Sequence, residues 1–182
     1  MRIIGGKWKG LTLPYQKNIS ARPTTDRAKE ALFNILIHRY EMEGKRVLDL
    51  FTGTGSIALE FISRGVANVV AVDQDIKPLK NLQQFCKTHQ IKGIKIHKSD
   101  VLAFLNREKI DETNESQRFD FIFADPPYHW PKLADLPLMV KDSGLLRQGG
   151  LFMLEHPKGF PFPVEASEER NYGQSAFSFY EG

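Results

Sequence analysis

The chain has 182 residues, of which 41% are hydrophobic and 26% are charged, and its formal net charge is +3. This composition excludes a disordered chain and suits one domain, residues 1–182, with a full-sized core. We find no signal peptide and no apolar run near the roughly 18 residues of a membrane span, so we expect a soluble, cytoplasmic protein. The only cysteine is Cys86, which excludes an internal disulfide and a Cys-x-x-Cys zinc cluster, and we expect no metal.

Residues 1–20 are predicted to form an irregular or short-hairpin arm, because Gly5, Gly6 and Gly10 supply turn flexibility. The start of the chain is also basic. Residues 1–29 hold seven lysines and arginines against one acidic residue, whereas the rest of the chain holds 18 basic and 21 acidic residues. This asymmetry favours a polyanionic partner, although a solvated arm without a partner is equally compatible with charge alone. The basic residues are Arg2, Lys7, Lys9, Lys17, Arg22, Arg27 and Lys29.

The catalytic core, residues 21–182, is predicted to begin with a helix from Thr24 or Thr25 to about His38, where apolar residues recur at helical spacing. Short apolar strands then alternate with helices, which is typical of a three-layer α/β fold with a mostly parallel sheet. The tail predicts a closing antiparallel hairpin around Gly173. We expect strands at residues 47–51, 69–72, 94–97, 119–124, 150–155, 169–172 and 176–181, helices at 56–64, 79–88, 101–105 and 132–143, and a loop at 106–118.

A glycine-rich turn follows the first predicted strand. Its glycines let the backbone approach a ligand closely at the carboxyl edge of the sheet, which indicates a nucleotide-like ligand. The spacing Gly53-x-Gly55-x-x-Ala58, with Asp73 at the end of the second strand, also matches the dinucleotide pattern of an oxidoreductase. A tight turn that binds no ligand is the third interpretation of this segment.

Acidic residues on three successive strands favour S-adenosylmethionine over a dinucleotide. A carboxylate at Asp49, near the end of the first strand, would repel a pyrophosphate but suits the cationic amino group of a methionine, directly or through water. Asp73 suits the ribose hydroxyls and Asp100 the adenine amine. Each of these residues is also typical of a loop aspartate that caps a turn. The predicted cofactor site comprises Asp49, Phe51, Thr52, Gly53, Thr54, Gly55, Asp73, Asp100 and Val101.

A second cluster of functional residues, Asp125-Pro126-Pro127-Tyr128, follows the apolar fourth strand. An amino group on an aromatic base is a poor nucleophile because its lone pair is delocalised into the ring, and acceptors aimed at the amine hydrogens recover that lone pair. The Asp125 carboxylate and the Pro126 carbonyl are the predicted acceptors. The prolines, Pro126 and Pro127, stiffen the loop, and Tyr128 can stack on the base. We therefore predict a catalytic loop for amine methylation at residues 125–128.

Segments spread over nearly the whole chain resemble the RsmD-type 16S ribosomal RNA guanine-N2 methyltransferases. The segments at residues 2–10 and 22–27 are specific to this family. Many methyltransferases share the glycine turn, and DNA amino-methyltransferases share an Asp-Pro-Pro-Tyr loop. Thr52 and Thr54 stand where alanine and serine are common in the family, and Asp73 stands where a glutamate is usual. The matching segments are residues 2–10, 22–27, 30–34, 48–55, 63–65, 125–128 and 172–173.

The resemblance implies a seven-stranded, Rossmann-like class I methyltransferase fold and the cofactor S-adenosylmethionine. It also implies a guanine of 16S ribosomal RNA as substrate, presented in the assembled or assembling 30S subunit. Residues 49–55, Asp73 and residues 125–128 carry over as cofactor and catalytic positions. The basic arm then gains a function, since its side chains can neutralise RNA phosphates around a flipped-out guanine. The predicted RNA-binding residues are Arg2, Lys7, Lys9, Arg22 and Arg27.

Three other functions are compatible with parts of the sequence. A DNA adenine-N6 or cytosine-N4 amino-methyltransferase shares the catalytic loop, but the chain lacks room for a sizeable target-recognition domain. An oxidoreductase would use the glycine turn alone. An RNA-binding ribosome-assembly module would need neither feature, and the intact residues 125–128 argue against it. The sequence assigns no role to His129, Trp130 or His156.

Overall fold

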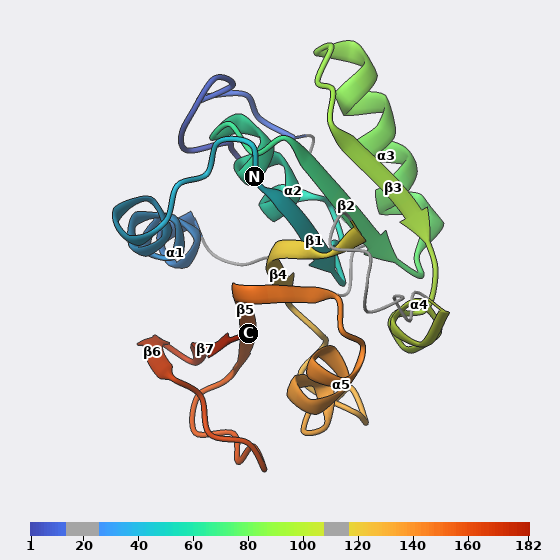
Figure 1. Ribbon diagram of the computed structural model, residues 1–182. Helices are drawn as coiled ribbons and strands as arrows, with labels where there is room; N and C mark the ends of the chain where they lie inside the picture. Colours follow the sequence, from blue (N-terminus) through green and yellow to red (C-terminus); the bar gives the residue numbers. More distant parts are fainter. Residues whose placement is uncertain (14–25, 108–116) are drawn as a thin grey trace.

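The computed structural model describes residues 1–13, 26–107 and 117–182, and one seven-stranded sheet runs through its centre (Figure 1). Its strands are β1 (Arg46–Leu50), β2 (Asn68–Asp73), β3 (Ile94–Lys98), β4 (Phe119–Ala124), β5 (Leu146–Pro157), β6 (Glu168–Tyr172) and β7 (Ser175–Glu181). The strand order is β3-β2-β1-β4-β5-β7-β6. The first five strands pair in parallel, whereas β7 runs antiparallel to both β5 and β6. The predicted parallel sheet and closing hairpin are therefore confirmed.

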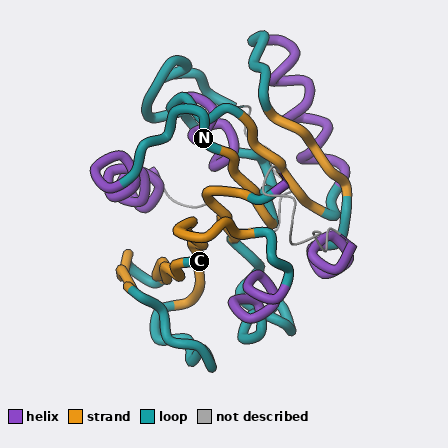
Figure 2. The backbone as a smooth tube through the Cα atoms, viewed as in Figure 1, coloured by secondary structure: helices purple, strands orange, loops and turns teal. Residues whose placement is uncertain are grey.

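The helices cover both faces of the sheet and divide between two hydrophobic cores. One core contains buried residues of α1 (Asp26–Arg39), α2 (Ser56–Ser63) and α3 (Ile76–Thr88). The other contains buried residues of α4 (Val101–Arg107) and α5 (Leu136–Asp142). Figure 2 shows this three-layer arrangement of helices around the strands. Across the described ranges, no helix combines the length and the apolar character that a membrane span requires.

Three elements differ from the prediction by three residues or more at one end. β5 is longer at both ends, because it pairs with β4 on one side and with β7 on the other. α3 begins earlier, at Ile76, because the side chain of Asp75 caps its first turn. α5 is shorter and begins at Leu136, since a proline such as Pro137 is tolerated only in the first turn of a helix. The predicted N-cap of α1 and most of the loop at 106–118 lie outside the described residues.

The N-terminal arm is a short hairpin that lies on α2. Arg2 forms an antiparallel bridge with Thr12, and the amide of Ile3 donates to the carbonyl of Leu11 at 2.9 Å. All eight residues of α2 are buried. The sheet lies beneath this helix, α1 and α3 pack beside it, and the hairpin covers its remaining side (Figure 1). The described part of the arm, residues 1–13, is therefore packed on the core, and binding of a polyanion by its exposed basic side chains stays a prediction.

A buried carboxylate, that of Glu60, holds the hairpin on α2. Its oxygens accept hydrogen bonds from the amides of Ile4 at 2.9 Å and Gly5 at 2.8 Å. The guanidinium of Arg64 binds the same carboxylate at 2.9 Å, and the ammonium of Lys29 lies 3.9 Å from it. Because Glu60 is 0% exposed, its negative charge depends on these donors for stabilisation in place of water.

The hairpin approaches α2 so closely that one of its positions requires glycine. Gly6 has a φ of 74°, and a Cβ atom there would lie 1.8 Å from the carbonyl oxygen of Ser63. The same carbonyl accepts a hydrogen bond from the amide of Lys7 at 2.7 Å, and the Ser63 hydroxyl accepts one from the amide of Trp8 at 3.0 Å. The glycines of the arm thus permit close packing on the helix as well as turns.

Replacing Glu60 with alanine should lower the free energy of unfolding by about 3–5 kcal/mol, because the change removes the carboxylate that binds Arg64 and lies beside buried Lys29, and it removes the acceptor of two backbone amides. Urea titration of the purified protein measures this loss. Glu30, exposed on α1, provides the matched control, and its alanine variant should stay within about 0.5 kcal/mol of the parent. Equal losses in the two variants would mean that the buried carboxylate does not hold the hairpin.

Candidate active site

The glycine turn and the predicted catalytic loop begin at the ends of neighbouring strands. Leu50, the last residue of β1, pairs with Ala124, the last residue of β4. The amide of Asp125 donates to the carbonyl of Leu50 at 3.4 Å, so the two segments touch where they leave the sheet. Residues 51–55 and 125–128 therefore lie side by side at the carboxyl edge, in the geometry that the sequence predicts.

Three residues of the turn have left-handed backbone conformations. The φ angles of Phe51, Gly53 and Gly55 are 58°, 52° and 78°. A Cβ atom on Gly55 would come within 2.5 Å of the Leu82 side chain of α3, so packing requires glycine there. At Gly53, apart from its chain neighbours, the described residues bring only the carbonyl oxygen of Phe51 within 4 Å of such a Cβ, at 3.9 Å, so they leave this side of the turn open. Gly55 thus fits the turn to the core, and Gly53 leaves room for a ligand.

Asp49 lies inside β1, one residue before its end, and its carboxylate is buried. Its Oδ2 accepts hydrogen bonds from the Thr52 hydroxyl at 2.5 Å and from the Ala58 amide at 3.1 Å. Burial is the main cause that raises the pKa of the Asp49 carboxyl to about 7, whereas the two hydrogen bonds act in the opposite direction. Asp49 therefore stabilises the turn and the start of α2 through these two internal hydrogen bonds. Its contact with a methionine amino group stays a prediction.

Asp73 ends β2 and ties this strand to the glycine turn. Its Oδ2 accepts a hydrogen bond from the amide of Gly53 at 2.8 Å, and its Oδ1 accepts one from the amide of Asp75 at 2.9 Å. The side chain is half-buried, and a carboxylate offers about four acceptor positions. Asp73 therefore positions the turn and keeps acceptor positions for the hydroxyls of a ribose.

Two further predicted cofactor residues lie at the start of α4, where Asp100 precedes the helix and Val101 is its first residue. Asp100 is exposed, and its Oδ1 accepts a hydrogen bond from the amide of Ala103 at 3.0 Å, so it caps the first turn of α4. Val101 is buried in the core beneath that helix. A structural role therefore explains both residues, and their contact with an adenine stays a prediction.

The catalytic loop is anchored at its start and closed by a turn. Asp125 and Tyr128 are half-buried, Pro126 is buried and Pro127 is exposed. The amide of Trp130 donates to the carbonyl of Pro127 at 2.7 Å. The rings of Phe51 and Trp130 pack edge to face, with centroids 4.9 Å apart. Trp130 thus joins the loop to the glycine turn, a role that an isolated tryptophan with no neighbouring pattern does not reveal in the sequence.

The predicted RNA-binding residues are spread along the hairpin and α1. The hairpin runs parallel to α2, since Met1 Sδ lies 3.8 Å from Thr54 Oγ1, whereas the amide of Lys7 binds Ser63 at the opposite end of α2. An eight-residue helix is about 12 Å long, so Arg2 lies nearer the glycine turn than Lys7 and Lys9 do. Exposed residues of the set are Arg2, Lys7, Lys9 and Arg27, and Arg22 lies outside the described residues.

Lys29 is a buried structural residue, although the charge count includes it with the basic arm. Its Nζ donates to the carbonyl of Arg2 at 2.7 Å and to the hydroxyl of Ser56 at 3.0 Å. Burial lowers the pKa of this ammonium, and the nearby carboxylate of Glu60 opposes that effect. Lys29 therefore joins the hairpin to the first residue of α2 and is not available for a phosphate.

The raised pKa of Asp49 predicts a pH-dependent stability. Between about pH 4 and pH 7 the unfolded chain loses the Asp49 proton while the folded protein keeps it, so this residue lowers the free energy of unfolding as the pH rises, by at most about 1.4 kcal/mol per pH unit. Asp49→Asn keeps an acceptor oxygen for Thr52 and Ala58 but does not titrate. Its stability relative to the parent should increase from pH 4 to pH 7 in urea titrations. Parallel curves for the two proteins would exclude a raised pKa.

Comparisons with known proteins identify relatives over the whole chain. A family model described as conserved hypothetical protein 95 matches residues 1–181. The putative rRNA methyltransferase YlbH of Bacillus subtilis is 31% identical over 99% of this chain and 98% of its own length. The ribosomal RNA small subunit methyltransferase D of Escherichia coli K12 is 30% identical over 100% of this chain and 89% of its own length.

A solved structure agrees with these matches. A hypothetical protein of Thermus thermophilus is 35% identical and superposes with a TM-score of 0.86 over 100% of this chain and 99% of its own. The matched region contains the hairpin, the glycine turn and the loop at 125–128, which carry the resemblance seen in the sequence. The chain therefore belongs to the conserved hypothetical protein 95 family, the RsmD-type methyltransferase family that its sequence resembles.

Proposed function

We propose that the protein transfers a methyl group from S-adenosylmethionine to the exocyclic N2 amine of a guanine in 16S ribosomal RNA. The substrate would be the assembled or assembling 30S subunit in the cytoplasm. The observation that carries the proposal is the contact between the glycine turn and the catalytic loop, made by Leu50 and Asp125. Relatives named as a putative rRNA methyltransferase and as a ribosomal RNA small subunit methyltransferase support this substrate class.

The residues around the glycine turn fit S-adenosylmethionine better than a phosphate-bearing dinucleotide. Asp100 follows β3 at this edge of the sheet, and its carboxylate would repel a pyrophosphate, whereas Asp73 at the end of β2 suits the ribose of either cofactor. Asp73 retains acceptor positions for ribose hydroxyls, and the open side of Gly53 admits a ligand close to the backbone. Bound S-adenosylmethionine would supply a methyl group activated by a positively charged sulfur.

The catalytic loop would make the guanine amine nucleophilic. The carboxylate of Asp125 and the carbonyl of Pro126 accept the two N–H groups of the amine, which turns the nitrogen lone pair away from the ring system and toward the methyl carbon. As the new N–C bond forms, positive charge develops on the nitrogen and the Asp125 carboxylate stabilises it. One N–H proton then leaves to Asp125 or to water. Tyr128 stacks on the guanine ring and holds it in line.

Exposed basic residues would hold the RNA around the displaced base. A base inside a helix cannot reach the loop, so the guanine must leave its stack. Arg2 lies at the end of the hairpin nearest the glycine turn, and Arg27 lies in the first turn of α1. Lys7 and Lys9 would contact phosphates farther from the guanine. These contacts favour binding at low salt and carry little sequence information.

Asp125→Ala should bind S-adenosylmethionine with nearly the parent affinity and methylate about 10²- to 10³-fold more slowly, because it removes an acceptor that acts while charge develops on the amine. Calorimetry measures cofactor binding. Transfer of tritiated methyl groups to small subunits that lack the modification measures the rate, and identification of the methylated nucleotide tests the guanine N2 position.

The matched control is Asp135, an exposed aspartate seven residues from the end of the catalytic loop, whose alanine variant should methylate at the parent rate. Undiminished transfer by Asp125→Ala would exclude the role given to that carboxylate. Transfer to DNA but not to small subunits would favour the DNA amino-methyltransferase. NAD binding without S-adenosylmethionine binding would favour the oxidoreductase, and RNA binding without any transfer would favour an assembly module.

Charge reversal at Lys7 and Lys9 should weaken RNA binding and flatten its dependence on salt, because each lost phosphate contact lowers the slope of log K against log salt by roughly 0.7–0.9. Filter binding of small-subunit RNA at several salt concentrations measures the slope. Both side chains are exposed, so cofactor affinity should not change. An unaltered slope would leave the hairpin with its packing role alone.

A further inference from the structure

A second basic surface lies on α3 and β3. Residues 76–99 contain six lysines and no aspartate or glutamate, and all six lysine side chains are exposed. Of the 25 lysines and arginines in the chain, 13 lie in residues 1–29 and 76–99, which together hold Asp26 as their one acidic residue. Positive charge is therefore concentrated in two segments, the N-terminal one at residues 1–29 and a second one at residues 76–99. The α3–β3 lysines are Lys77, Lys80, Lys87, Lys92, Lys95 and Lys98.

The ion pairs of the described residues involve basic side chains other than these six lysines. The guanidinium of Arg39 binds Glu168 at 2.5 Å, and that of Arg147 binds Asp120 at 2.7 Å. Within the described parts of the chain, no carboxylate forms an ion pair with any of the six lysines. Their charges therefore add to a positive potential along α3 and the β3 edge of the sheet.

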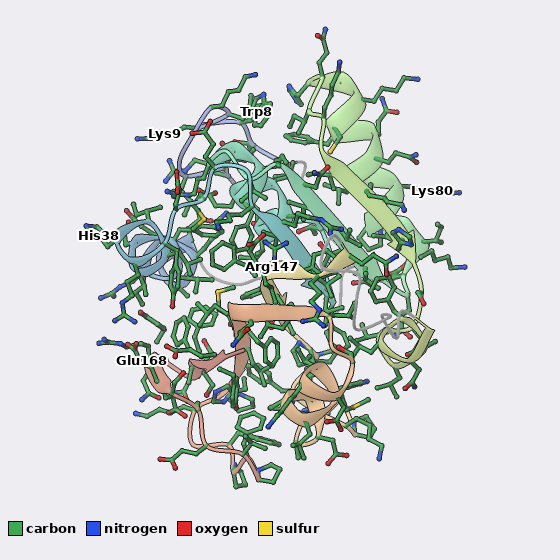
Figure 3. The ribbon with its side chains drawn as sticks, in the orientation of Figure 1. Trp8, Lys9, His38, Lys80, Arg147 and Glu168 are labelled. Atoms are coloured by element: carbon green, nitrogen blue, oxygen red, sulfur yellow. The ribbon has the colours of Figure 1, made fainter. Side chains whose placement is uncertain are left out.

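The lysines of α3 form a stripe along the exposed side of the helix. Lys77, Lys80 and Lys87 are three and seven residues apart, and such spacings lie on one side of a helix. The opposite side, with Leu82 and Phe85, is buried against the sheet. α3 has 13 residues and is about 20 Å long. Figure 3 shows Lys80 extending away from the sheet into solvent.

The stripe begins at the edge of the sheet that carries the candidate active site. α3 follows β2, and Lys77 donates its amide to the side chain of Asp75, the helix cap that in turn binds Asp73. From there the stripe runs along the same face of the sheet as the hairpin, with α2 between the two. A strand whose base enters the active site can therefore continue along α3.

Protection of a sheet edge explains the lysines of β3 but not those of α3. β3 is an edge strand, and lysines on such a strand prevent pairing with another chain. Lys92, Lys95 and Lys98 lie on or beside this strand. The stripe on α3 faces solvent above the sheet, where no strand edge is exposed. A separate reason is needed for three uncompensated charges in that stripe.

We propose that the α3 lysine stripe binds phosphates of the RNA strand that flanks the target guanine. This inference rests on the proposed function, since it assigns a further contact surface to the same RNA. Lysine ammonium groups are point charges on flexible stems and suit phosphate oxygens without reading bases. The stripe therefore contributes affinity and orientation, and the guanine is selected at the catalytic loop.

The test compares two variants with the same change in net charge. Lys80→Gln/Lys87→Gln removes two positive charges from the stripe, and Lys141→Glu removes the same net charge from α5 on the opposite face of the sheet. Loss of two phosphate contacts should reduce the change in RNA affinity between 50 mM and 200 mM salt by roughly tenfold. The α5 variant should keep the salt dependence of the parent. Filter binding of small-subunit RNA measures both.

Two further measurements separate failure of this inference from failure of the proposed function. Both variants should bind S-adenosylhomocysteine like the parent and methylate normally when RNA is saturating, since the stripe lies outside the catalytic loop. The inference would be overturned if the parent protein methylates RNA but the stripe variant shows the same salt dependence as the parent or as the α5 variant. A parent protein that transfers no methyl group to RNA would overturn the proposed function and this inference with it.

Discussion

The parallel pairing of β1 with β4 is the constraint on which the rest of the site depends. Parallel strands leave a sheet at the same edge, so the segments that follow Leu50 and Ala124 have to meet. The rings of Phe51 and Trp130 then pack across the contact, so side chains maintain the position that the backbone sets. This rigidity matters because a displacement of about 1 Å between reacting groups can cost roughly 10²-fold in rate.

Buried polar groups join α2 to its surroundings at both ends. Asp49 holds the glycine turn at the start of the helix, and Glu60 holds the hairpin farther along it. Lys29 connects the two regions, since its ammonium binds both Ser56 at the helix start and the carbonyl of Arg2 in the hairpin. The turn, the helix and the hairpin are therefore joined by one set of buried hydrogen bonds.

Local patterns in the sequence predict the strands, the hairpin and the two functional turns, because each depends on neighbouring residues. Contacts between distant residues are not predictable in this way. Glu60 binds Ile4 across 56 positions, and no local pattern relates the two residues. The sequence likewise presents Lys29 as a surface charge and does not reveal the internal hydrogen bonds of Asp49, because it does not show which way a side chain points. Burial, which decides both cases, emerges only from the packing of the hairpin and of α2 on the sheet.

The distribution of charge around the site bears on how RNA would approach it. Asp73, Asp100 and Asp125 follow three strands at the carboxyl edge, whereas the exposed lysines lie on the hairpin and along α3. Acidic residues at the edge repel a phosphate but not a neutral guanine ring, and the lysines attract the phosphates to positions farther back. An RNA backbone that follows the lysines would therefore keep away from the cofactor, and a base would have to leave its stack to reach the proposed catalytic loop. Charge segregation thus favours a flipped-out base before any contact specific to guanine is made.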